Sequence, residues 1–559
     1  MISPIAWKLR TFSFDLPVGA FPEILERLGG TPCRATELVT SIPEDVLATR
    51  VNGKWSAKEH LGHLADLGDL DDLRLGEFLA HSPTLSAADM ENTATENAAH
   101  NRRPISVVLN RLRAHRAELV RKLELLTEDQ IAFPSLHPRL QKEMRLVDWA
   151  YFVAEHDDHH LALARQCILE LRRTKIATSS ARELFEIPDG VTYLNCANMA
   201  PQMRVITDSG IRAVQSKATP WRLSDWFAPS EELRTLAARV MGTSSDAIAL
   251  IPAASYGIAI AAKNLPFSAG QQIVGLDQEF PSNVYAWREL AKANSGQLVQ
   301  AKREPGESWT GAVMRSINDK TAIVAVPQCH WTDGSKIDLE QIGDRARALG
   351  AALVVDASQS LGASVLNLDR IKPDFLTAVG YKWLLGPYGL GYLYVAPRWR
   401  DTGIPLEQSW LTRAGSEDFT RLVEYTDHYR PGARRFDMGE FPQFVATPMA
   451  IAALQQVLSW GVASIQQALS VLTGKVAQLS AEIGYAALPA PERCGHMIGI
   501  RRAGGIPASL SQALRDANVF VSVRGDSIRI APHLYNDVDD VERLFEVLRT
   551  LPPPPFTET

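Results

Sequence analysis

Beyond residue 186, short apolar segments alternate with longer stretches of helical periodicity, and this alternation restricts the possible folds more than any other feature of the chain. The apolar segments are dominated by Ala, Ile, Leu and Val, which is typical of buried strands. A chain that alternates strand and helix in this way folds into a mostly parallel sheet with helices on both faces. We therefore expect an α/β domain whose strands include residues 247–251, 272–276, 321–326 and 351–356.

The first part of the chain has a different pattern, in which apolar residues recur every three or four positions and β-branched runs are rare. This spacing is typical of helices that bury one face. It occurs over residues 22–28, 57–78, 105–126 and 146–171, which predicts a four-helix bundle. We expect this all-α bundle over residues 1–172, a polar linker over 173–186, the large α/β domain over 187–445 and a small C-terminal α/β subdomain over 446–559.

Composition argues against several classes of protein. A chain of 559 residues exceeds what one hydrophobic core usually supports, and 46% hydrophobic with 22% charged residues is ordinary for globular proteins. The net charge of -6 gives no reason to expect a nucleic-acid partner. No stretch reaches the roughly 18 apolar residues of a membrane span, and the first residues lack the pattern of a signal peptide. The five cysteines are scattered without metal or disulfide spacing, so we expect a cytoplasmic protein with no membrane partner.

The segment over residues 354–390 carries the most specific chemistry. Asp356 ends an apolar run, so its carboxylate is expected at the carboxyl end of a buried strand, where a site can open. Gln359 follows three residues later, and Lys382 lies in the segment AVGYKW before a tight GPYG turn. This order suits pyridoxal phosphate, because a carboxylate keeps the pyridine nitrogen protonated while a lysine amine forms a Schiff base and moves the α proton. Gln359 is predicted to hydrogen-bond the phenolic oxygen of the ring.

With these motifs in order, residues 193–551 resemble class V of the fold-type I pyridoxal-phosphate enzymes, which includes aminotransferases, cysteine desulfurases, kynureninases and isopenicillin N epimerase-like proteins. The resemblance implies that Lys382 is the catalytic lysine and that Asp356 and Gln359 bind the cofactor ring. It also implies roles for other matching residues: Ser255 and Tyr256 near the phosphate in IPAASYG, Phe280 stacked on the ring in FPSN, Tyr381 reaching the phosphate, and Trp331 in HWTDG beside the substrate.

The C-terminal part is similar to the family segment that holds the substrate carboxylate. Arg529 in RIAPHLYN matches the arginine that forms a bidentate pair with this carboxylate, so an amino acid or amino-acid-like small molecule is implied as substrate, and Arg524 can assist. Glu440 replaces a threonine whose hydroxyl, in the family, reaches the phosphate of a partner subunit. A homodimer is expected, because the family builds its site across two subunits.

Differences from the relatives narrow the predicted chemistry. A cysteine desulfurase hands sulfur to a cysteine on a loop of the C-terminal part, but no cysteine follows Cys494. Tyr381 stands where desulfurases have histidine, as it does in kynureninases. We therefore expect transamination, C–S or C–C bond cleavage, or epimerisation at the α-carbon of an amino acid, without persulfide formation.

The helical part carries a separate candidate metal site. His156 and His160 are four residues apart, so they project from one face of a helix, and His63 on another helix can complete a set of three imidazoles. The segments KWSAKEHLGHLAD and AEHDDHHL resemble the DinB-like metal-binding bundle, and imidazole ligands suit zinc, nickel or ferrous iron. His60 and His159 lie off the shared face and are expected to support the ligands or to face solvent. A metal-dependent thiol transferase located in this bundle is the alternative function.

Overall fold

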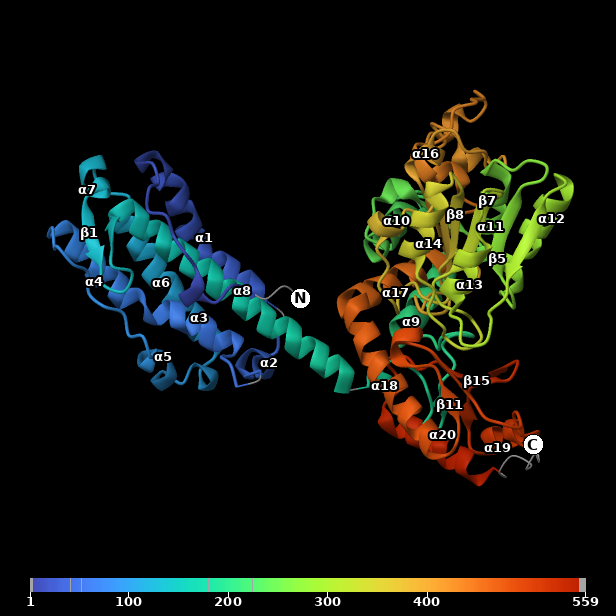
Figure 1. Ribbon diagram of the computed structural model, residues 1–559. Helices are drawn as coiled ribbons and strands as arrows, with labels where there is room; N and C mark the ends of the chain where they lie inside the picture. Colours follow the sequence, from blue (N-terminus) through green and yellow to red (C-terminus); the bar gives the residue numbers. More distant parts are fainter. Residues whose placement is uncertain (1–3, 41, 52, 179, 224, 552–559) are drawn as a thin grey trace. The chain divides into compact units, whose positions relative to one another are not determined.

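The computed structural model describes residues 4–40, 42–51, 53–178, 180–223 and 225–551. The chain divides into two compact units, Met1–Lys175 and Ile176–Thr559 (Figure 1). Helix α8 (Leu146–Thr178) extends through residues 173–178, which we expected to be linker. Nothing in the sequence ends this helix earlier, because neither proline nor glycine occurs between residues 146 and 178. The first part of the expected linker is therefore helical.

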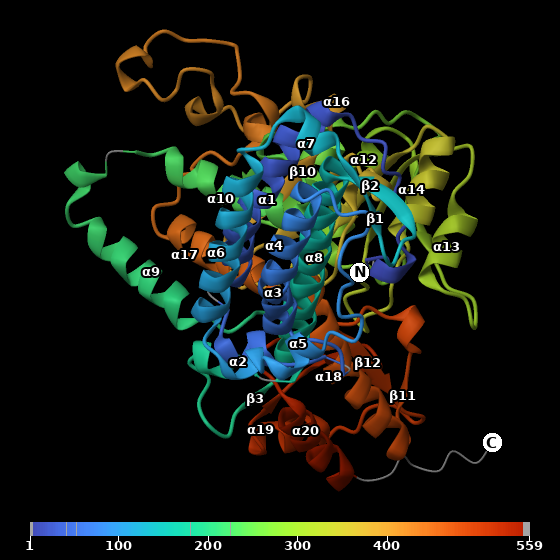
Figure 2. The ribbon, with the colours of Figure 1, turned by 90° about the vertical axis from the view of Figure 1, so that its left-hand side faces the viewer.

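The long helices of the first unit are α1 (Phe21–Val39), α3 (Ala57–Asp66), α4 (Gly68–Leu79), α6 (Ile105–Leu123) and α8 (Figure 2). Helix α6 packs against α1, α3 and α4. A capping box fixes the start of α3, since the Ser56 hydroxyl accepts a hydrogen bond from the Glu59 amide and the Glu59 carboxylate accepts one from the Ser56 amide. The single helix expected over residues 57–78 is two helices, because the chain turns at Leu67 and α4 begins at Gly68.

An antiparallel hairpin of two short strands, β1 (Pro134–His137) and β2 (Lys142–Arg145), is a feature of the first unit that the helical periodicity did not predict. At four residues each, the strands are too short for their pattern to stand out between two helices. The prediction of an all-α unit is wrong at this hairpin and holds for the long elements. The other short elements are η1 (Trp7–Leu9), η2 (Val18–Ala20), α2 (Glu44–Ala48), α5 (Thr93–Asn97), η3 (His100–Arg102) and α7 (Glu128–Ala132).

A buried ion cluster connects three helices of the first unit. Arg116 on α6 is 1% exposed and donates hydrogen bonds to Asp157 on α8 at 2.9 and 2.7 Å and to Asp71 on α4 at 2.7 Å. One buried cation between two buried carboxylates is stable only with close contacts of this kind. The cluster therefore fixes α4, α6 and α8 relative to one another directly beside the histidine-bearing turn of α8.

The second unit contains a seven-stranded mixed sheet in the order β4-β10-β9-β8-β7-β5-β6. Neighbouring strands pair in parallel except β10, which is antiparallel to both β4 and β9. The prediction of a mostly parallel sheet is confirmed, and the four expected strands end within one residue of their predicted limits. The strands are β4 (Ile248–Ile251), β5 (Gln272–Leu276), β6 (Gln297–Ala301), β7 (Thr321–Pro327), β8 (Ala352–Asp356), β9 (Phe375–Val379) and β10 (Gly391–Val395).

Both faces of this sheet are covered, and successive side chains of a strand enter different cores. On β7, Val324 and Val326 belong to one buried apolar cluster, whereas Ile323 and Ala325 belong to another. Burial on both sides explains why the strands are apolar throughout instead of alternating with polar residues. Helices α10 (Ala228–Met241), α13 (Trp309–Ser316), α14 (Leu339–Ala348) and α17 (Ala446–Trp460) contribute to the first cluster, and α11 (Ala254–Asn264) and α12 (Tyr285–Ala293) to the second.

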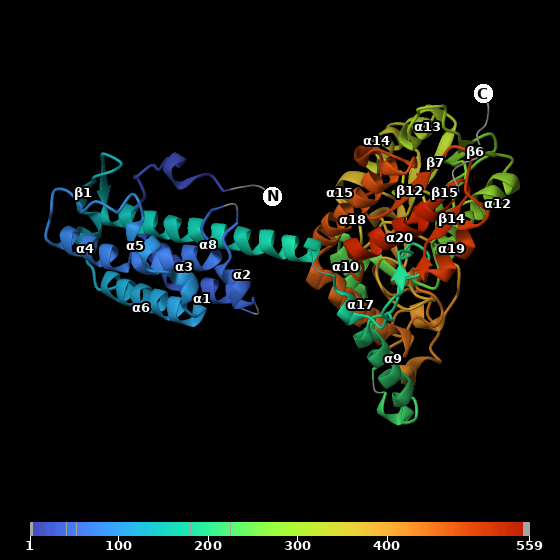
Figure 3. The same cartoon turned by 90° about the horizontal axis from the view of Figure 1, so that it is seen from below.

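The C-terminal part of the second unit is a smaller assembly of helices on a four-stranded sheet of order β11-β12-β15-β14 (Figure 3). Among the residues that the structure describes, no single helix has the length and apolarity of a membrane span; α17 and α18 do so only when taken together across a bend of 75°. The elements are α18 (Val462–Glu482), β11 (Ala486–Ala487), β12 (Ile498–Arg501), α19 (Leu510–Asp516), β14 (Ser522–Arg524), β15 (Ser527–Ile530) and α20 (Val538–Thr550).

A parallel pair of short strands, β3 (Thr192–Tyr193) and β13 (Val519–Phe520), joins the beginning of the second unit to its C-terminal part. The remaining elements of this unit lie in its connections. They are η4 (Arg182–Leu184), α9 (Arg204–Ser216), η5 (Pro220–Arg222), η6 (Ser245–Ala247), η7 (Pro281–Asn283), α15 (Leu368–Ile371), α16 (Pro397–Arg400), η8 (Trp410–Thr412), η9 (Phe419–Arg421), η10 (Gly432–Phe436) and η11 (Ala490–Glu492).

Candidate functional site

A cavity of about 270 Å³ opens at the carboxyl ends of the central strands of the large sheet. Its walls come from the ends of β7, β8 and β9, from the first turn of α11 and from the loop after β5. Ligand sites in open α/β sheets form at this edge, where connections leave neighbouring strands. Seven of the predicted site residues line the cavity: Ser255, Phe280, Trp331, Asp356, Gln359, Tyr381 and Lys382.

Asp356 and Lys382, the two ionisable residues on which the predicted cofactor site depends, are both buried, with exposures of 6% and 7%. Burial raises the pKa of the Asp356 carboxyl and lowers the pKa of the Lys382 amine to about 8, while each charge favours the ionised form of the other. Within the described ranges, the Lys382 amine forms neither a hydrogen bond nor an ion pair. The ring centroids of Phe280 and Tyr381 lie 5.5 and 5.8 Å from its nitrogen. An amine with this pKa is partly neutral near pH 8 and can attack a carbonyl carbon.

The Gln359 side chain faces the cavity while two protein hydrogen bonds fix its orientation. Its Nε2 donates to the Ala197 carbonyl at 3.0 Å, and its Oε1 accepts from the Trp383 indole nitrogen at 3.0 Å. The amide nitrogen carries two hydrogens, so one N–H remains for a ligand oxygen. This geometry is compatible with the predicted bond to a phenolic oxygen.

The first turn of α11 forms one end of the cavity. Ala253, Ala254 and Ser255 line it, and all three have small side chains at the start of α11. The first backbone N–H groups of a helix have no partner within it and carry the positive end of its dipole, which suits an anion such as phosphate. Tyr381 lies at the same cavity, with its ring 4.5 Å from that of Tyr388.

Tyr256 is not among the residues that line this cavity, although we predicted that it binds the cofactor. Its ring packs against the buried clusters on both sides of the sheet, and its hydroxyl is close to Glu407. Burial and the Glu407 carboxylate both raise the pKa of Tyr256. Successive side chains of a helix point about 100° apart. Ser255 therefore faces the cavity while its neighbour turns into the core.

Phe280 and Trp331 form an aromatic wall beside Lys382. Their rings meet edge to face with centroids 5.6 Å apart, and the Trp331 indole donates a hydrogen bond to the Gln278 carbonyl at 2.8 Å. The Arg524 guanidinium lies 5.8 Å from the Trp331 ring. Phe280 is 37% exposed, so one side of its ring remains open to a ligand. This arrangement is compatible with stacking of Phe280 on a planar cofactor.

Arg529 lies on β15 behind Trp331 and is 1% exposed. Its Nη1 donates to the Trp331 carbonyl at 2.7 Å and its Nη2 to the Ser522 hydroxyl at 3.5 Å, while its Nε has no partner among the residues that the structure describes. Burial and the nearby Arg524 charge lower the pKa of Arg529 to about 10. None of the described carboxylates forms an ion pair with it. A buried guanidinium without an anion is the group expected for binding an external carboxylate.

Glu279 is a cavity residue that the sequence analysis missed. It is 8% exposed, its Oε1 accepts from the Phe280 amide at 2.6 Å, and its Oε2 accepts from the Asn283 side chain at 3.3 Å. Burial, reinforced by the Asp356 charge, raises the pKa of Glu279 to about 8. A second acid at neutral pH therefore lines the cavity beside Asp356. Its position directly before Phe280, after the apolar segment 272–276, was the available signal.

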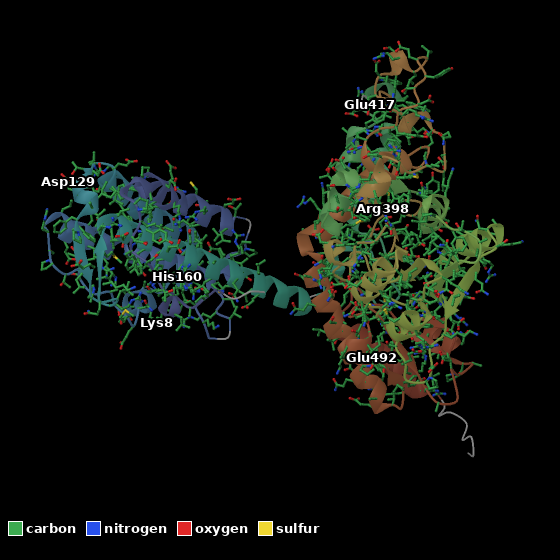
Figure 4. The ribbon with its side chains drawn as sticks, turned by 45° about the horizontal axis from the view of Figure 1, so that its top comes forward. Lys8, Asp129, His160, Arg398, Glu417 and Glu492 are labelled. Carbon is green, nitrogen blue, oxygen red and sulfur yellow. The ribbon has the colours of Figure 1, made fainter. Side chains whose placement is uncertain are left out.

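The first unit brings together the three predicted metal ligands. The candidate ligand atoms of His63 on α3 and of His156 and His160 on α8 all lie within 4.8 Å of one another (His160 is labelled in Figure 4). Hydrogen bonds orient two of the rings: His63 Nδ1 is 3.0 Å from the Thr95 hydroxyl, and His160 Nδ1 is 3.0 Å from His60 Nδ1. With Nδ1 engaged in these contacts, Nε2 is the nitrogen available to a metal on each ring, as in metal sites whose outer partners fix the ligands.

Two further histidines lie close to this triad. His60 is buried and orients His160, which matches the supporting role expected for it. His159 is buried, lines the neighbouring cavity and lies 5.6 Å from the Trp7 ring, so it does not face bulk solvent. His60 reaches the site because it is three residues before His63, a spacing that places both on one side of α3.

Comparison with known proteins agrees with the class that this fold and cavity define, a pyridoxal-phosphate enzyme built on an α/β sheet. Residues 222–544 match the family described as aminotransferase class-V, and residues 27–164 match the DinB superfamily. The chain belongs to the class-V aminotransferase family and carries an N-terminal DinB superfamily region.

Its relatives in this family are distant and catalyse different reactions. An uncharacterized aminotransferase of Bacillus subtilis is 27% identical over 376 residues, which cover 65% of this chain and 95% of the relative. Isopenicillin N epimerase of Streptomyces clavuligerus is 25% identical over 57% of this chain and 84% of its own length. Kynureninase of Deinococcus radiodurans is 27% identical over 41% of this chain and 54% of its own length.

Solved structures show the same fold. A cysteine desulfurase from Thermococcus onnurineus covers 66% of this chain and 96% of its own, with a TM-score of 0.57 and 22% identity. A cystine C–S lyase in complex with cysteine persulfide covers 65% and 99%, with a TM-score of 0.58 and 18% identity. At these identities the likeness concerns the fold of the second unit only.

Proposed function

We propose that the protein catalyses a reaction at the α-carbon of an amino acid, with pyridoxal phosphate held in the cavity of the second unit. One observation carries this proposal: in a class-V chain, a buried amine, Lys382, and a buried carboxylate, Asp356, line the same small cavity. An amine and a carboxylate of this kind are the protein groups that such a cofactor requires.

Each residue of the cavity has a definite task in this proposal. The cofactor, when bound, supplies an electron-accepting ring for charge that develops at the α-carbon. Asp356 keeps a proton on the ring nitrogen, and Phe280 covers one face of the ring. Lys382 holds the cofactor and moves the proton at the α-carbon, for which a pKa of about 8 is well placed near neutral pH. Ser255 and the start of α11 bind the phosphate.

The substrate is proposed to enter past Trp331, with its carboxylate on Arg529. This guanidinium is buried, has an unused Nε donor and lacks an ion-pair partner among the described carboxylates. A carboxylate that replaces this missing partner gains charge-assisted hydrogen bonds in a site that excludes water. The Trp331 ring restricts the neighbouring space to a side chain that can pack against an aromatic surface.

The cysteines near the cavity support a reaction in which no cysteine of the protein accepts a sulfur atom from the substrate. Burial raises the pKa of the Cys329 thiol, which lines the cavity, and also that of Cys196. A thiol with a raised pKa is a poor nucleophile because the thiolate is the reactive form. Transamination, cleavage of a C–S or C–C bond, and epimerisation, the reaction named for one relative, remain the candidate outcomes.

Reconstitution of the full chain with pyridoxal phosphate tests the assignment of the cofactor. The wild-type protein is expected to gain an absorbance band above about 400 nm from the lysine-bound cofactor. Lys382→Ala should lack this band, whereas Lys292→Ala, which removes an exposed amine from α12, should keep it. A band of equal intensity in Lys382→Ala would contradict the proposal.

A screen of amino acids and S-substituted cysteines by absorbance, followed by mass identification of products, then distinguishes the reactions. A keto acid with aminated cofactor indicates transamination, pyruvate with ammonia and a released thiol indicates C–S cleavage, and inverted configuration indicates epimerisation. For the amino acid that reacts, Arg529→Gln should raise the KM at least tenfold, a rough figure for loss of one charged hydrogen-bonded pair. The cofactor band should remain, since Arg529 does not line the cofactor cavity.

A homodimer is part of the proposal and has support from the surface of the second unit. Tyr425, Val423 and Trp221 are 96%, 81% and 78% exposed, and apolar side chains at such exposure often mark a subunit interface. Sedimentation of the wild type and of Tyr425→Asp measures this directly. We expect a dimer that Tyr425→Asp weakens, and a wild-type monomer at micromolar concentration would contradict it.

A second proposed function is the binding of a transition-metal ion by His63, His156 and His160. The observation that favours it is the convergence of three imidazoles within 4.8 Å, two of them oriented by hydrogen bonds through Nδ1. Metal analysis of the purified full chain should find about one zinc, nickel or iron ion per chain. His156→Ala should lose it, while His81→Ala, on an exposed residue after α4, should retain it. Equal metal content in both variants would contradict the site.

A further inference from the structure

A second cavity, of about 450 Å³, lies over the histidine triad of the first unit. Residues from the N-terminal segment, α3, α4, α6, α8 and the β1–β2 hairpin line it. Its volume falls in the range of pockets that bind small molecules. The aromatic rings of Trp7, Trp55 and Phe152 form apolar walls, and Lys8, labelled in Figure 4, lies at the same cavity.

Two donor residues, one at the end of β1 and one in the turn after it, line this cavity without an acceptor among the described residues. The Nδ1 atom of His137 accepts a hydrogen bond from the Leu140 amide at 3.3 Å, so in the neutral ring the proton is on Nε2. Nε2 is buried and has no hydrogen-bond partner in the described part of the chain, and the residue is 3% exposed. Burial lowers the pKa of His137 to about 4, which keeps the ring neutral. An unsatisfied buried donor destabilises the folded state, so a ligand acceptor that meets this N–H is favoured.

The second donor group is Arg139, two residues further along the hairpin. Among the described residues it forms no hydrogen bond and no ion pair; its guanidinium lies 5.9 Å from the Phe152 ring centroid. Arg139 is half-buried, so water only partly solvates this charge, and burial lowers its pKa. By contrast, Arg116 in the same lining is fully occupied by Asp71 and Asp157. Arg139 is therefore a cation with unused, directional donors.

The cavity as a whole has more positive than negative charge available to a ligand. Arg74, which is 5% exposed, also lines it, and within the described ranges its hydrogen bonds go to the Ser86 carbonyl alone, at 3.0 and 2.8 Å. The acidic residues of the lining are Asp71, which is paired with Arg116, and Asp89, which accepts backbone hydrogen bonds at the start of α5. Neither carboxylate is paired with Arg74 or Arg139.

Ring contacts connect Arg139 to the triad. The Phe152 ring lies 5.0 Å from the Trp7 ring, which in turn lies 4.8 Å from His156. A molecule bound at Arg139 therefore extends along an aromatic wall toward the three imidazoles.

We propose that this cavity is a second small-molecule site, which binds an organic acid with its carboxylate on Arg139 and His137 and its apolar or aromatic body against Phe152 and Trp7. The acidic group satisfies both unused donors, and guanidinium with an N–H donor is a common set for a carboxylate. The proposal does not depend on a metal at the triad, because the carboxylate contacts come from the hairpin alone. It also does not depend on the reaction of the second unit.

Binding of phenylacetate and of its neutral counterpart phenylacetamide to the full chain tests the proposal. The two probes have the same ring and nearly the same volume, so a difference in affinity measures recognition of the carboxylate. Titration calorimetry of protein with and without added zinc should give phenylacetate an affinity at least roughly tenfold higher than phenylacetamide.

Because Arg529 in the second unit is itself proposed to bind carboxylates, the site is identified by variants. At the cavity of the first unit, Arg139→Gln should abolish the preference for phenylacetate over phenylacetamide, and Arg139→Lys should keep part of it. Arg529→Gln should leave binding at this cavity unchanged. Arg121→Gln removes the same charge from an exposed position on α6 and should behave as wild type. Protection of β1–β2 peptides from hydrogen exchange by phenylacetate locates the event independently of enzyme activity.

Three outcomes would overturn the proposal: no binding of either probe at 20 mM, a concentration of the order at which such small ligands bind, equal affinity for acid and amide, or a preference for the acid that survives in Arg139→Gln. A preference that is lost in Arg139→Gln, kept in Arg121→Gln and accompanied by protection of the hairpin would establish the site.

Discussion

Burial of Glu279 predicts how strongly the free energy of unfolding of the second unit depends on pH. Its carboxyl group is 8% exposed beside Asp356, and its pKa is raised from 4.5 to about 8. The folded protein therefore holds a proton on Glu279 between about pH 4.5 and pH 8, whereas the unfolded chain releases it. The folded state binds more protons in this interval. The contribution of Glu279 to the free energy of unfolding is therefore fully retained below pH 4.5 and is lost as the pH rises to 8.

The magnitude can be worked from these two pKa values. Relative to a side chain that never ionises, the carboxyl group lowers the free energy of unfolding by about 0.8 kcal/mol at pH 5 and by about 4.4 kcal/mol at pH 8. The difference is about 3.5 kcal/mol, and a folded pKa one unit lower reduces it to about 2.5 kcal/mol. Glu279→Gln keeps a neutral side chain of the same size, so it should be increasingly more stable than wild type as the pH rises.

The assay compares wild type and Glu279→Gln after the cofactor has been removed, since a bound pyridine ring would change the charges around Asp356. Urea unfolding at pH 5 and pH 8 is followed by pulsed hydrogen exchange in peptides that cover β5 and β7, which report on the second unit alone. Subtracting the free energies of unfolding of the two proteins cancels the contributions of other groups, including Lys382, that titrate in both. Glu289→Gln, an exposed substitution on α12, serves as the control.

The reasoning fails if the difference between wild type and Glu279→Gln changes by less than about 1 kcal/mol from pH 5 to pH 8. It also fails if the sign is reversed, so that Glu279→Gln loses stability relative to wild type as the pH rises. Either result would mean that Glu279 is ionised in the folded protein.

Three further predictions concern other parts of the chain. The rate at which the cofactor-free protein captures pyridoxal phosphate should rise with pH and level off above about 8, the pKa of Lys382, and a rate that is flat from pH 6 to 9 would contradict it. Gly257→Ala should destabilise the second unit by about 1–3 kcal/mol in urea, because the added carbon would lie 2.5 Å from the Thr377 hydroxyl, whereas Gly474→Ala, with open space around it, should be neutral or stabilising. Arg116→Met should destabilise the first unit by about 3–5 kcal/mol, since it leaves two buried carboxylates without a cation, and unchanged unfolding of peptides from α6 would refute this.

The sheet of the second unit could be predicted because burial on both faces leaves a strong signal in the sequence. Asp356 was placed correctly at the end of β8 because a carboxylate that follows five apolar residues has to lie where the strand leaves the core. The position of Lys382 beside it could be expected only from the order of motifs, because 25 residues that include helix α15 and strand β9 separate the two, and the sequence contains no distance information. Their common cavity is a result of the parallel pairing of β8 with β9.

The features that the sequence did not predict depend on the direction of a side chain or the path of a loop, and not on residue type. Tyr256 is adjacent to Ser255, yet packing on Glu407 turns it away from the cavity. Glu279 looks like an ordinary surface acid in the sequence, and only the loop geometry after β5 buries it. The β1–β2 hairpin, with Arg139 in its turn, is shorter than the window in which periodicity can be recognised. Neither a rotation of one residue along a helix nor the path of a short loop leaves a trace in composition.

Both units contain buried or half-buried donors that the described residues leave unsatisfied, and this shared property has a thermodynamic consequence. Among the described residues, Arg529 has no anionic partner in the second unit, and His137 Nε2 and Arg139 have no acceptor in the first. A polar group left unsatisfied raises the free energy of the folded state, so a ligand that satisfies it stabilises the fold in addition to binding.

At 100 times its dissociation constant, each ligand should add about 2.7 kcal/mol to the stability of the unit that binds it. Hydrogen exchange at β7 should therefore slow with the amino-acid substrate, exchange at β1 should slow with phenylacetate, and Arg139→Gln should remove only the second effect. If phenylacetate slowed exchange at β7 alone, the unsatisfied donors of the hairpin would not be the groups that it meets.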